Sequence, residues 1–196
     1  MARLSSGLEF LESAVTYALA GAAMASPQLL SRPTPCLGWD LETLLDHLAD
    51  SIGVFSEALA TGCVGASPAP DHPGPDPVAR LRGQAVGLLA ACAACGPAER
   101  RVAIGDLELT ASMVAAAGAI EIAVHGWDIW AACGASRPVP PGLAAVLLPI
   151  APLLITPGTR PGLFADPVRL PGPAGPGDQL VAFLGRPPRL PAAPWA

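Results

Sequence analysis

The sequence predicts a mainly α-helical protein built around a four-helix bundle. Four stretches of about twenty residues each carry apolar side chains at helical spacing and are bounded by Pro, Gly or a capping residue. Alternation typical of strands is confined to one short segment. The chain has 196 residues, which suits one domain with an appendage. We therefore expect a bundle over 1–135 and an extension packed on it over 136–196.

The first helix is expected over 7–26, where apolar side chains return once per turn, and it stops before Pro27. Residues 28–38 should form an extended connector, because Pro33 and Pro35 cannot continue a helix. Asp40 then provides a good N-cap for a second helix over 41–59. The core-facing positions of that helix are Leu41, Leu44, Leu45, Leu48, Ile52 and Phe55.

A Gly- and Pro-rich loop over 62–77 separates the second helix from a third over 77–95. Residues 102–109 alternate around Gly105-Asp106, a pattern typical of a tight hairpin. Thr110 can cap the fourth helix over 111–132. The extension is rich in Pro and Gly, with one apolar stretch at 142–155 and a short amphipathic piece at 177–184.

Composition excludes several classes of function. All 11 basic residues are Arg, which removes Schiff-base lysine chemistry and the P-loop. The net charge of −5, without a basic run, argues against nucleic acid or an anionic membrane as partner. The most apolar run, over 143–155, is broken by Pro149 and Pro152 and is shorter than the ~20 residues that a membrane span needs. Glu9 and Glu12 argue against an export signal, so we expect a cytoplasmic protein.

The five cysteines, an odd number, indicate reduced thiols rather than a disulfide scaffold. Cys92 and Cys95 have redox spacing but lie in a helical Ala/Leu run, which favours two small buried residues. Cys36 is expected to pack rather than to act as a nucleophile. The low content of charged residues also makes a homodimer possible.

The candidate site consists of the few polar residues on otherwise apolar helices. Glu121, His125 and Asp128 are spaced i, i+4 and i+7, so they share one face of the fourth helix. His47 lies beside the leucine stripe of the second helix. Bundle interiors hold metals on such carboxylate and imidazole sets, and three protein ligands leave coordination positions open. Spacing alone slightly favours the alternative, in which Glu121 and His125 form an ordinary helix-surface pair and His47 is a histidine at the edge of the core with a backbone partner.

Three motifs carry a family resemblance. They are T-P-C-L-G-W over 34–39, L-L-D-H-L-A over 44–49 and E-I-A-V-H-G-W-D over 121–128. In this order they resemble the DinB-like, mycothiol-dependent maleylpyruvate isomerase N-terminal-domain family over about residues 5–135. The closing D-Q-L-V-A-F-L-G-R-P, which starts at Asp178, is similar to the end of compact actinobacterial members.

The resemblance implies a four-helix bundle that holds one divalent metal ion on His47, Glu121 and His125. The metal is usually zinc, although such a ligand set also suits nickel, iron or manganese. Asp128 is then a hydrogen-bond acceptor that orients an imidazole, or alternatively a surface carboxylate. Trp39 and Trp127 are expected to pack in the bundle rather than to bind substrate.

The resemblance also implies that a small thiol, mycothiol, is the co-substrate and that an electrophilic small molecule is the substrate. The isomerase itself has a sizeable C-terminal domain, whereas this chain has only about sixty residues there, which favours a thiol S-transferase over that isomerisation. A metal-dependent isomerase, cyclase or hydrolase that uses no thiol is the alternative. A non-catalytic metal-binding protein is a further one.

Overall fold

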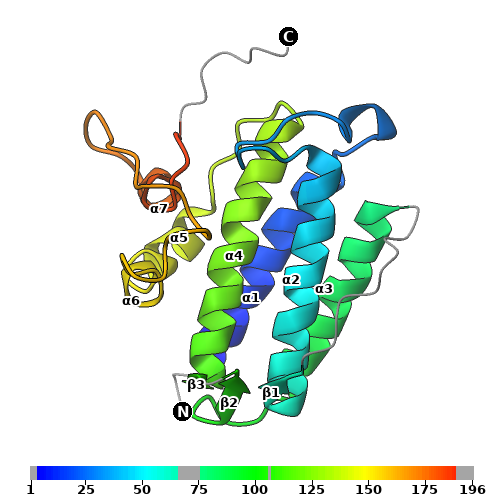
Figure 1. Ribbon diagram of the computed structural model, residues 1–196, viewed down its shortest axis with the longest axis vertical. Coiled ribbons are helices and arrows are strands. Elements are labelled where there is room, and N and C mark those ends of the chain that lie inside the picture. The colour runs from blue at the N-terminus through cyan, green and yellow to red at the C-terminus, as the bar shows by residue number, and fades with distance from the viewer. Residues whose placement is uncertain (1–3, 66–75, 106, 189–196) are drawn as a thin grey trace.

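The computed structural model describes residues 4–65, 76–105 and 107–188, and most of these residues are helical (Figure 1). Part of the predicted 62–77 loop and Asp106 of the predicted turn lie outside them. The long helices are α1 (Leu4–Ala22), α2 (Leu41–Thr61), α3 (Pro77–Ala94) and α4 (Ala111–Ala132). The shorter ones are η1 (Pro27–Leu29), α5 (Pro141–Leu147), α6 (Ala151–Leu154) and α7 (Pro176–Phe183).

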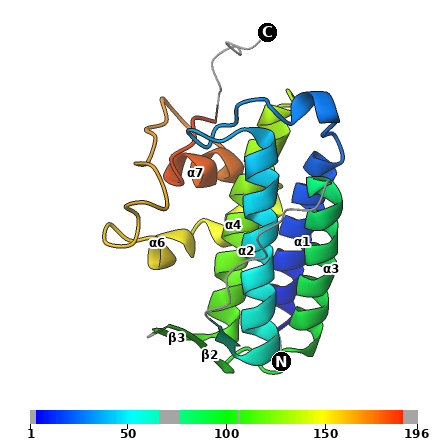
Figure 2. The ribbon, with the colours of Figure 1, turned by 45° about the vertical axis from the view of Figure 1, so that its right-hand side comes forward.

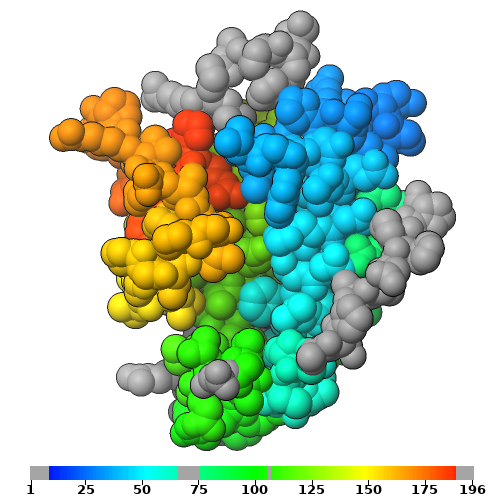
Figure 3. Space-filling view, in the orientation of Figure 1, coloured from blue at the N-terminus to red at the C-terminus, as the bar shows by residue number. Residues whose placement is uncertain are grey.

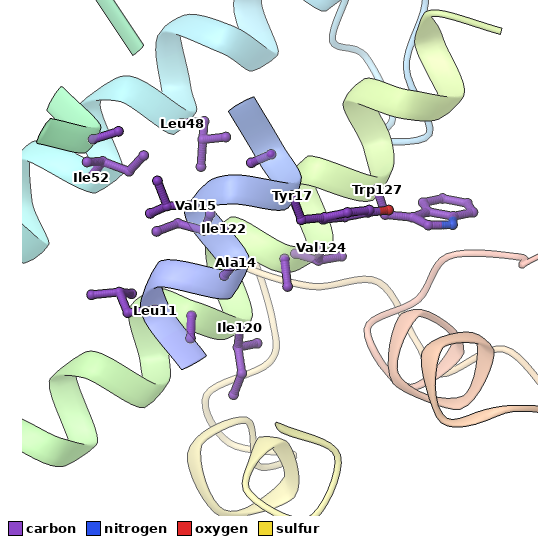
Figure 4. Close-up of a cluster of buried hydrophobic side chains, with 14 of the residues drawn as sticks. Leu11, Ala14, Val15, Tyr17, Leu48, Ile52, Ile120, Ile122, Val124 and Trp127 are labelled. Atoms are coloured by element: carbon purple, nitrogen blue, oxygen red, sulfur yellow. The ribbon is translucent and has the colours of Figure 1, made fainter. Parts of the chain in front are cut away.

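The four long helices form the predicted bundle, which confirms the fold class. α1 packs on α4 and α2 packs on α3, while α2 also contacts α4 and α1 contacts α3. Arg80, near the start of α3, pairs with Asp46, near the start of α2. Further along, Gly87 lies beside Ser56, so α2 and α3 run parallel. Figure 4 shows the apolar core between the helices, to which the following buried residues belong: Leu11, Val15, Leu48, Ile52, Ile120 and Ile122.

Short-range signals fixed the helix starts. The side chain of Asp40 accepts a hydrogen bond from Thr43 N at 2.9 Å, and Thr110 accepts one from Met113 N at 3.3 Å. Both predicted caps are therefore confirmed. The connector differs from the prediction, because η1 forms one helical turn where extended chain was expected. Pro27 occupies the first position of that turn, which its fixed φ favours.

The predicted hairpin is formed by β2 (Arg101–Ile104) and β3 (Leu107–Thr110), which pair antiparallel. The sequence did not predict a third strand. β1 (Cys63–Val64) follows directly after α2 and pairs in parallel with β2. Two residues are too few to show an alternating pattern, so this strand depends on its tertiary partner.

The C-terminal elements lie beside α4 on the side away from α3 (Figure 2). The apolar stretch predicted at 142–155 becomes two helices, α5 and α6, with Pro149 between them. α5 contacts α1, α4 and α7, and the Tyr17 hydroxyl donates a hydrogen bond to Arg137 O at 2.7 Å. The division of the chain at residue 135 stays a prediction. Among the described residues, none of the helices has the length and apolarity to cross a membrane.

The close approach of α1 and α4 requires a residue without a side chain at Gly126. A Cβ there would lie 3.0 Å from Tyr17 Cδ1 and 3.1 Å from Ala18 Cα. We expect Gly126→Ala to lower the free energy of unfolding by about 1–3 kcal/mol, because the helices must separate. Gly83→Ala, at an exposed position of α3 where a Cβ would meet no atom within 4 Å, should raise the free energy of unfolding by about 0.4–1 kcal/mol. Urea unfolding measures both, and equal effects would contradict this packing.

Candidate functional site

The bundle brings the donor atoms of His47, Glu121 and His125 together. His47 Nε2 lies 3.0 Å from Glu121 Oε1, and His125 Nε2 lies 3.3 Å from the same oxygen. One possible ligand atom from each residue falls within 4.8 Å of the others. The three residues that the motifs singled out therefore form one cluster, although they come from α2 and α4.

Helix periodicity explains why these side chains converge. Leu44, Leu45 and Leu48 of α2 are fully buried, and His47 lies at the edge of this stripe, where α2 meets α4. Glu121 and His125 are one turn apart on α4. The side chains are exposed by 35% for His47, 19% for Glu121 and 6% for His125. The cluster is thus anchored in the bundle at His125 and reaches solvent at His47.

Asp128 contacts the ring of His125, the histidine on α4, on the side away from Glu121. Its Oδ2 lies 3.0 Å from His125 Nδ1, and its side chain is fully buried, so it is not a surface carboxylate. An Nδ1 proton donated to Asp128 leaves Nε2 directed at Glu121. The carboxylate is held in turn by Arg186, whose Nη2 donates to Oδ2 at 2.9 Å and whose Nε donates to Oδ1 at 3.3 Å.

The cluster has a strong electrostatic coupling. Burial disfavours the charged form of His125, but hydrogen bonds to Asp128 and Glu121 outweigh burial and raise its pKa to about 9. Burial likewise opposes ionisation of Glu121, yet hydrogen bonds with His125 and His47 hold its pKa well below the usual range. At neutral pH His125 is therefore protonated on both ring nitrogens, and its Nε2 proton is directed at the ionised Glu121 carboxylate.

Trp39 and Ser51 complete the surroundings of the donor atoms. The ring centroid of Trp39 lies 4.5 Å from that of His47 and 6.1 Å from that of His125. The predicted packing role of Trp39 thus includes covering both imidazoles, whereas Trp127 is buried in the core. Ser51 Oγ donates to Glu121 Oε1 at 3.4 Å. Ser51 is one helical turn after His47, a signal that the sequence contained and that was not used.

The sequence patterns also did not predict Arg186 as a site residue. It is 58 residues from Asp128 in the chain, and no local periodicity links the two. The only sequence signal was its place in the closing G-R-P motif.

No cysteine belongs to the three-residue donor group, although Cys36 lies close enough to Arg186 to interact with it. Burial raises the pKa of the Cys36 thiol, against an opposing effect of Arg186, and burial raises that of Cys92 to about 12. Neither thiol is therefore activated as a nucleophile.

The surface above these helices is hollowed. Figure 3 shows a depression between α2, in cyan, and the yellow and orange C-terminal segment, with the green of α4 at its floor. The helices that carry the three donor residues thus form one wall and the floor of this depression. Two imidazole nitrogens and a carboxylate oxygen are a donor set typical of catalytic zinc and related ions.

Comparisons with known proteins point in the same direction. The family model for the mycothiol maleylpyruvate isomerase N-terminal domain matches residues 11–130. An uncharacterized protein of Mycobacterium tuberculosis, in strains CDC 1551 / Oshkosh and ATCC 25618 / H37Rv, is 32% identical over 170 residues. That match covers 80% of this chain and 85% of the relative. No solved structure matches this chain.

Proposed function

Because the chain belongs to the mycothiol maleylpyruvate isomerase N-terminal domain family, we propose that it is a metal-dependent enzyme that transfers a small thiol to an electrophilic small molecule. The thiol is of the mycothiol type. One observation carries the proposal: the donor atoms of His47, Glu121 and His125 converge within 4.8 Å. These three residues hold the divalent ion, and three protein ligands leave room for a further one. Zinc is the metal that we propose, while nickel, iron and manganese also accept this donor set.

The bound ion would supply Lewis acidity that stabilises the thiolate of a small thiol at neutral pH, where a free thiol is mostly protonated. The chain's own residues supply the positioning. Asp128 accepts a hydrogen bond from His125 Nδ1. The proton of the neutral imidazole thus stays on Nδ1, and the lone pair of Nε2 is available to the metal ion. Trp39 packs against both imidazoles and shields that side from water. The exposed side of His47 leaves a way in for the thiol and the electrophile.

The transfer forms one sulfur–carbon bond with the electron pair of sulfur. In a displacement, the leaving group departs with the electrons of the bond that breaks, and the thiol proton passes to solvent. Neither a lysine amine nor a further histidine is needed at the cluster, which agrees with a chain that contains three His and no Lys.

The test incubates zinc-loaded protein with mycothiol and a panel of small electrophiles and follows the loss of free thiol. We expect thiol consumption that depends on the protein and on the electrophile. Product formed at the same rate without thiol would instead favour the metal-dependent isomerase, cyclase or hydrolase. Zinc binding with no turnover of any compound in the panel would favour a non-catalytic metal-binding protein.

The affinity for zinc should depend on pH. Below the pKa of about 9, His125 of the ion-free protein carries a proton that zinc must displace. The affinity should therefore rise by about tenfold per pH unit as the pH approaches that value, and then level off with respect to His125. Competition with a chelator of known proton affinity measures this dependence between about pH 6 and about pH 10. A flat profile would show that no proton is displaced.

We also propose a cytoplasmic location, with a small molecule rather than nucleic acid as partner. The free thiols of Cys36, Cys63, Cys92, Cys95 and Cys133 suit a reducing compartment, and the net charge of −5 disfavours a polyanion. A homodimer is proposed from the sparse surface charge, and light scattering at high concentration tests it.

A further inference from the structure

Arg186 makes a buried ion pair with the residue that orients His125. Two of its nitrogens donate to the two oxygens of Asp128, at 2.9 and 3.3 Å, and Nη1 donates to Leu184 O at 2.9 Å. Arg186 is 5% exposed and Asp128 is 0% exposed. A two-pronged contact of this kind fixes the plane of a carboxylate, which a single hydrogen bond does not.

The backbone conformation at the end of α7 fixes the position of Arg186. α7 ends in a Schellman turn, in which Gly185 N donates to Ala182 O at 3.1 Å and Arg186 N donates to Val181 O at 2.9 Å. Gly185 has φ +84°, and a Cβ there would lie 2.8 Å from Ala165 O. The turn therefore requires glycine at this position, and it fixes the residue that follows.

A continuous chain of contacts leads from this turn to the candidate metal ligands. Asp128 Oδ2 accepts from Arg186 Nη2 and also lies 3.0 Å from His125 Nδ1. His125 Nε2 in turn faces Glu121. The orientation of one ligand thus depends on a carboxylate that the C-terminal segment holds in place.

We propose that Arg186 is a positioning residue of the metal site: by holding Asp128 it fixes the imidazole of His125, so that the C-terminal segment belongs to the site. This inference rests on the proposed metal site. Arg186 itself touches neither the ion nor the substrate. Its removal should leave Asp128 free to rotate, and His125 should then bind metal less well.

The test measures zinc affinity by chelator competition, without any assay of activity. Arg186→Met should bind zinc about tenfold more weakly than wild type, the size of effect that losing an outer hydrogen-bond partner has on a metal site. The matched control is Arg160→Met. Arg160 is also buried in the C-terminal segment, donates to Ala165 O and lies over Phe183, but it does not contact Asp128, so its loss should leave affinity unchanged.

A double-mutant cycle separates positioning from general stability. Asp128→Asn should weaken zinc binding about tenfold, and adding Arg186→Met to it should weaken binding no further, because Arg186 acts through Asp128. Fully additive losses, or Arg186→Met binding as tightly as Arg160→Met, would overturn the inference while the proposed function stands. If Arg186→Met does not fold, Arg186→Lys replaces it in the same comparison. Lysine keeps the charge but not the fork, and wild-type affinity in that variant would be equally contradictory.

A wild-type protein that binds no zinc would overturn the proposed function and this inference with it. The two failures are thus distinguishable, because failure of this inference alone leaves zinc binding by the wild-type protein intact.

Discussion

Glu121→Gln is expected to reduce zinc affinity by more than about a hundredfold, which exceeds the effect of losing an outer hydrogen-bond partner. The carboxylate oxygen lies between His47 Nε2 and His125 Nε2, at 3.0 and 3.3 Å, and it is the charged member of the donor set. Glutamine keeps the shape of the side chain and removes the charge. The substitution therefore separates a metal ligand from a residue that only packs.

The same variant distinguishes a metal site from the alternative of an ordinary helix-surface ion pair. That alternative predicts a small loss of stability and no effect on metal binding. Glu57→Gln is the matched control. Glu57 is a partly exposed glutamate on α2, and its carboxylate accepts a hydrogen bond from Gly65 N, away from the cluster. Calorimetric titration with zinc measures both variants. Similar affinities for the two would exclude Glu121 as a ligand.

Removal of the metal is expected to abolish thiol transfer and to leave the helices in place. The bundle core consists of apolar side chains on all four long helices, and their packing supplies most of the stability of the fold. The ion-free cluster also has internal partners, since Glu121 accepts hydrogen bonds from the histidines. A chelated sample should therefore keep its helical circular dichroism, unlike a small zinc finger.

The measurement is the rate of thiol consumption before chelation, after chelation and after zinc is added back. We expect a fall of more than about a hundredfold and recovery on addition of zinc. A chelated sample that works at the wild-type rate, with its lack of metal verified, would rule out metal-dependent transfer. Loss of helical signal on chelation would show instead that the ion supports the fold.

Local patterns predicted most of the fold. The apolar stripes located all four bundle helices, and the starts of α2 and α4 follow directly from the side chains of Asp40 and Thr110, which cap them. The end of α1 was placed too late. α1 ends at Ala22, because the next amides, Met24 N and Ala25 N, donate to Gly21 O and Ala22 O in tighter i to i+3 turns. Ser26 is then extended before Pro27, as residues before proline are.

Features that depend on distant partners were not predictable in the same way. β1 forms because Cys63 pairs with Ala103, and the short segment carries no pattern of its own. The spacing of Glu121, His125 and Asp128 showed that they share a face. It did not show that Asp128 is buried or that its partner is Arg186, which comes from the distant C-terminal segment. These two pairings connect residues about forty and about sixty positions apart, and periodicity reports only on neighbours within a few turns.

The metal content of the protein tests the central claim most directly. Wild type, His47→Ala and His125→Ala are each equilibrated with excess zinc, freed of unbound ion and subjected to elemental analysis, with circular dichroism to verify the fold. We predict about one zinc ion per wild-type chain and near-complete loss in both variants, because each removes one of three protein ligands. Stoichiometric zinc retained in both variants would contradict a site formed by His47, Glu121 and His125.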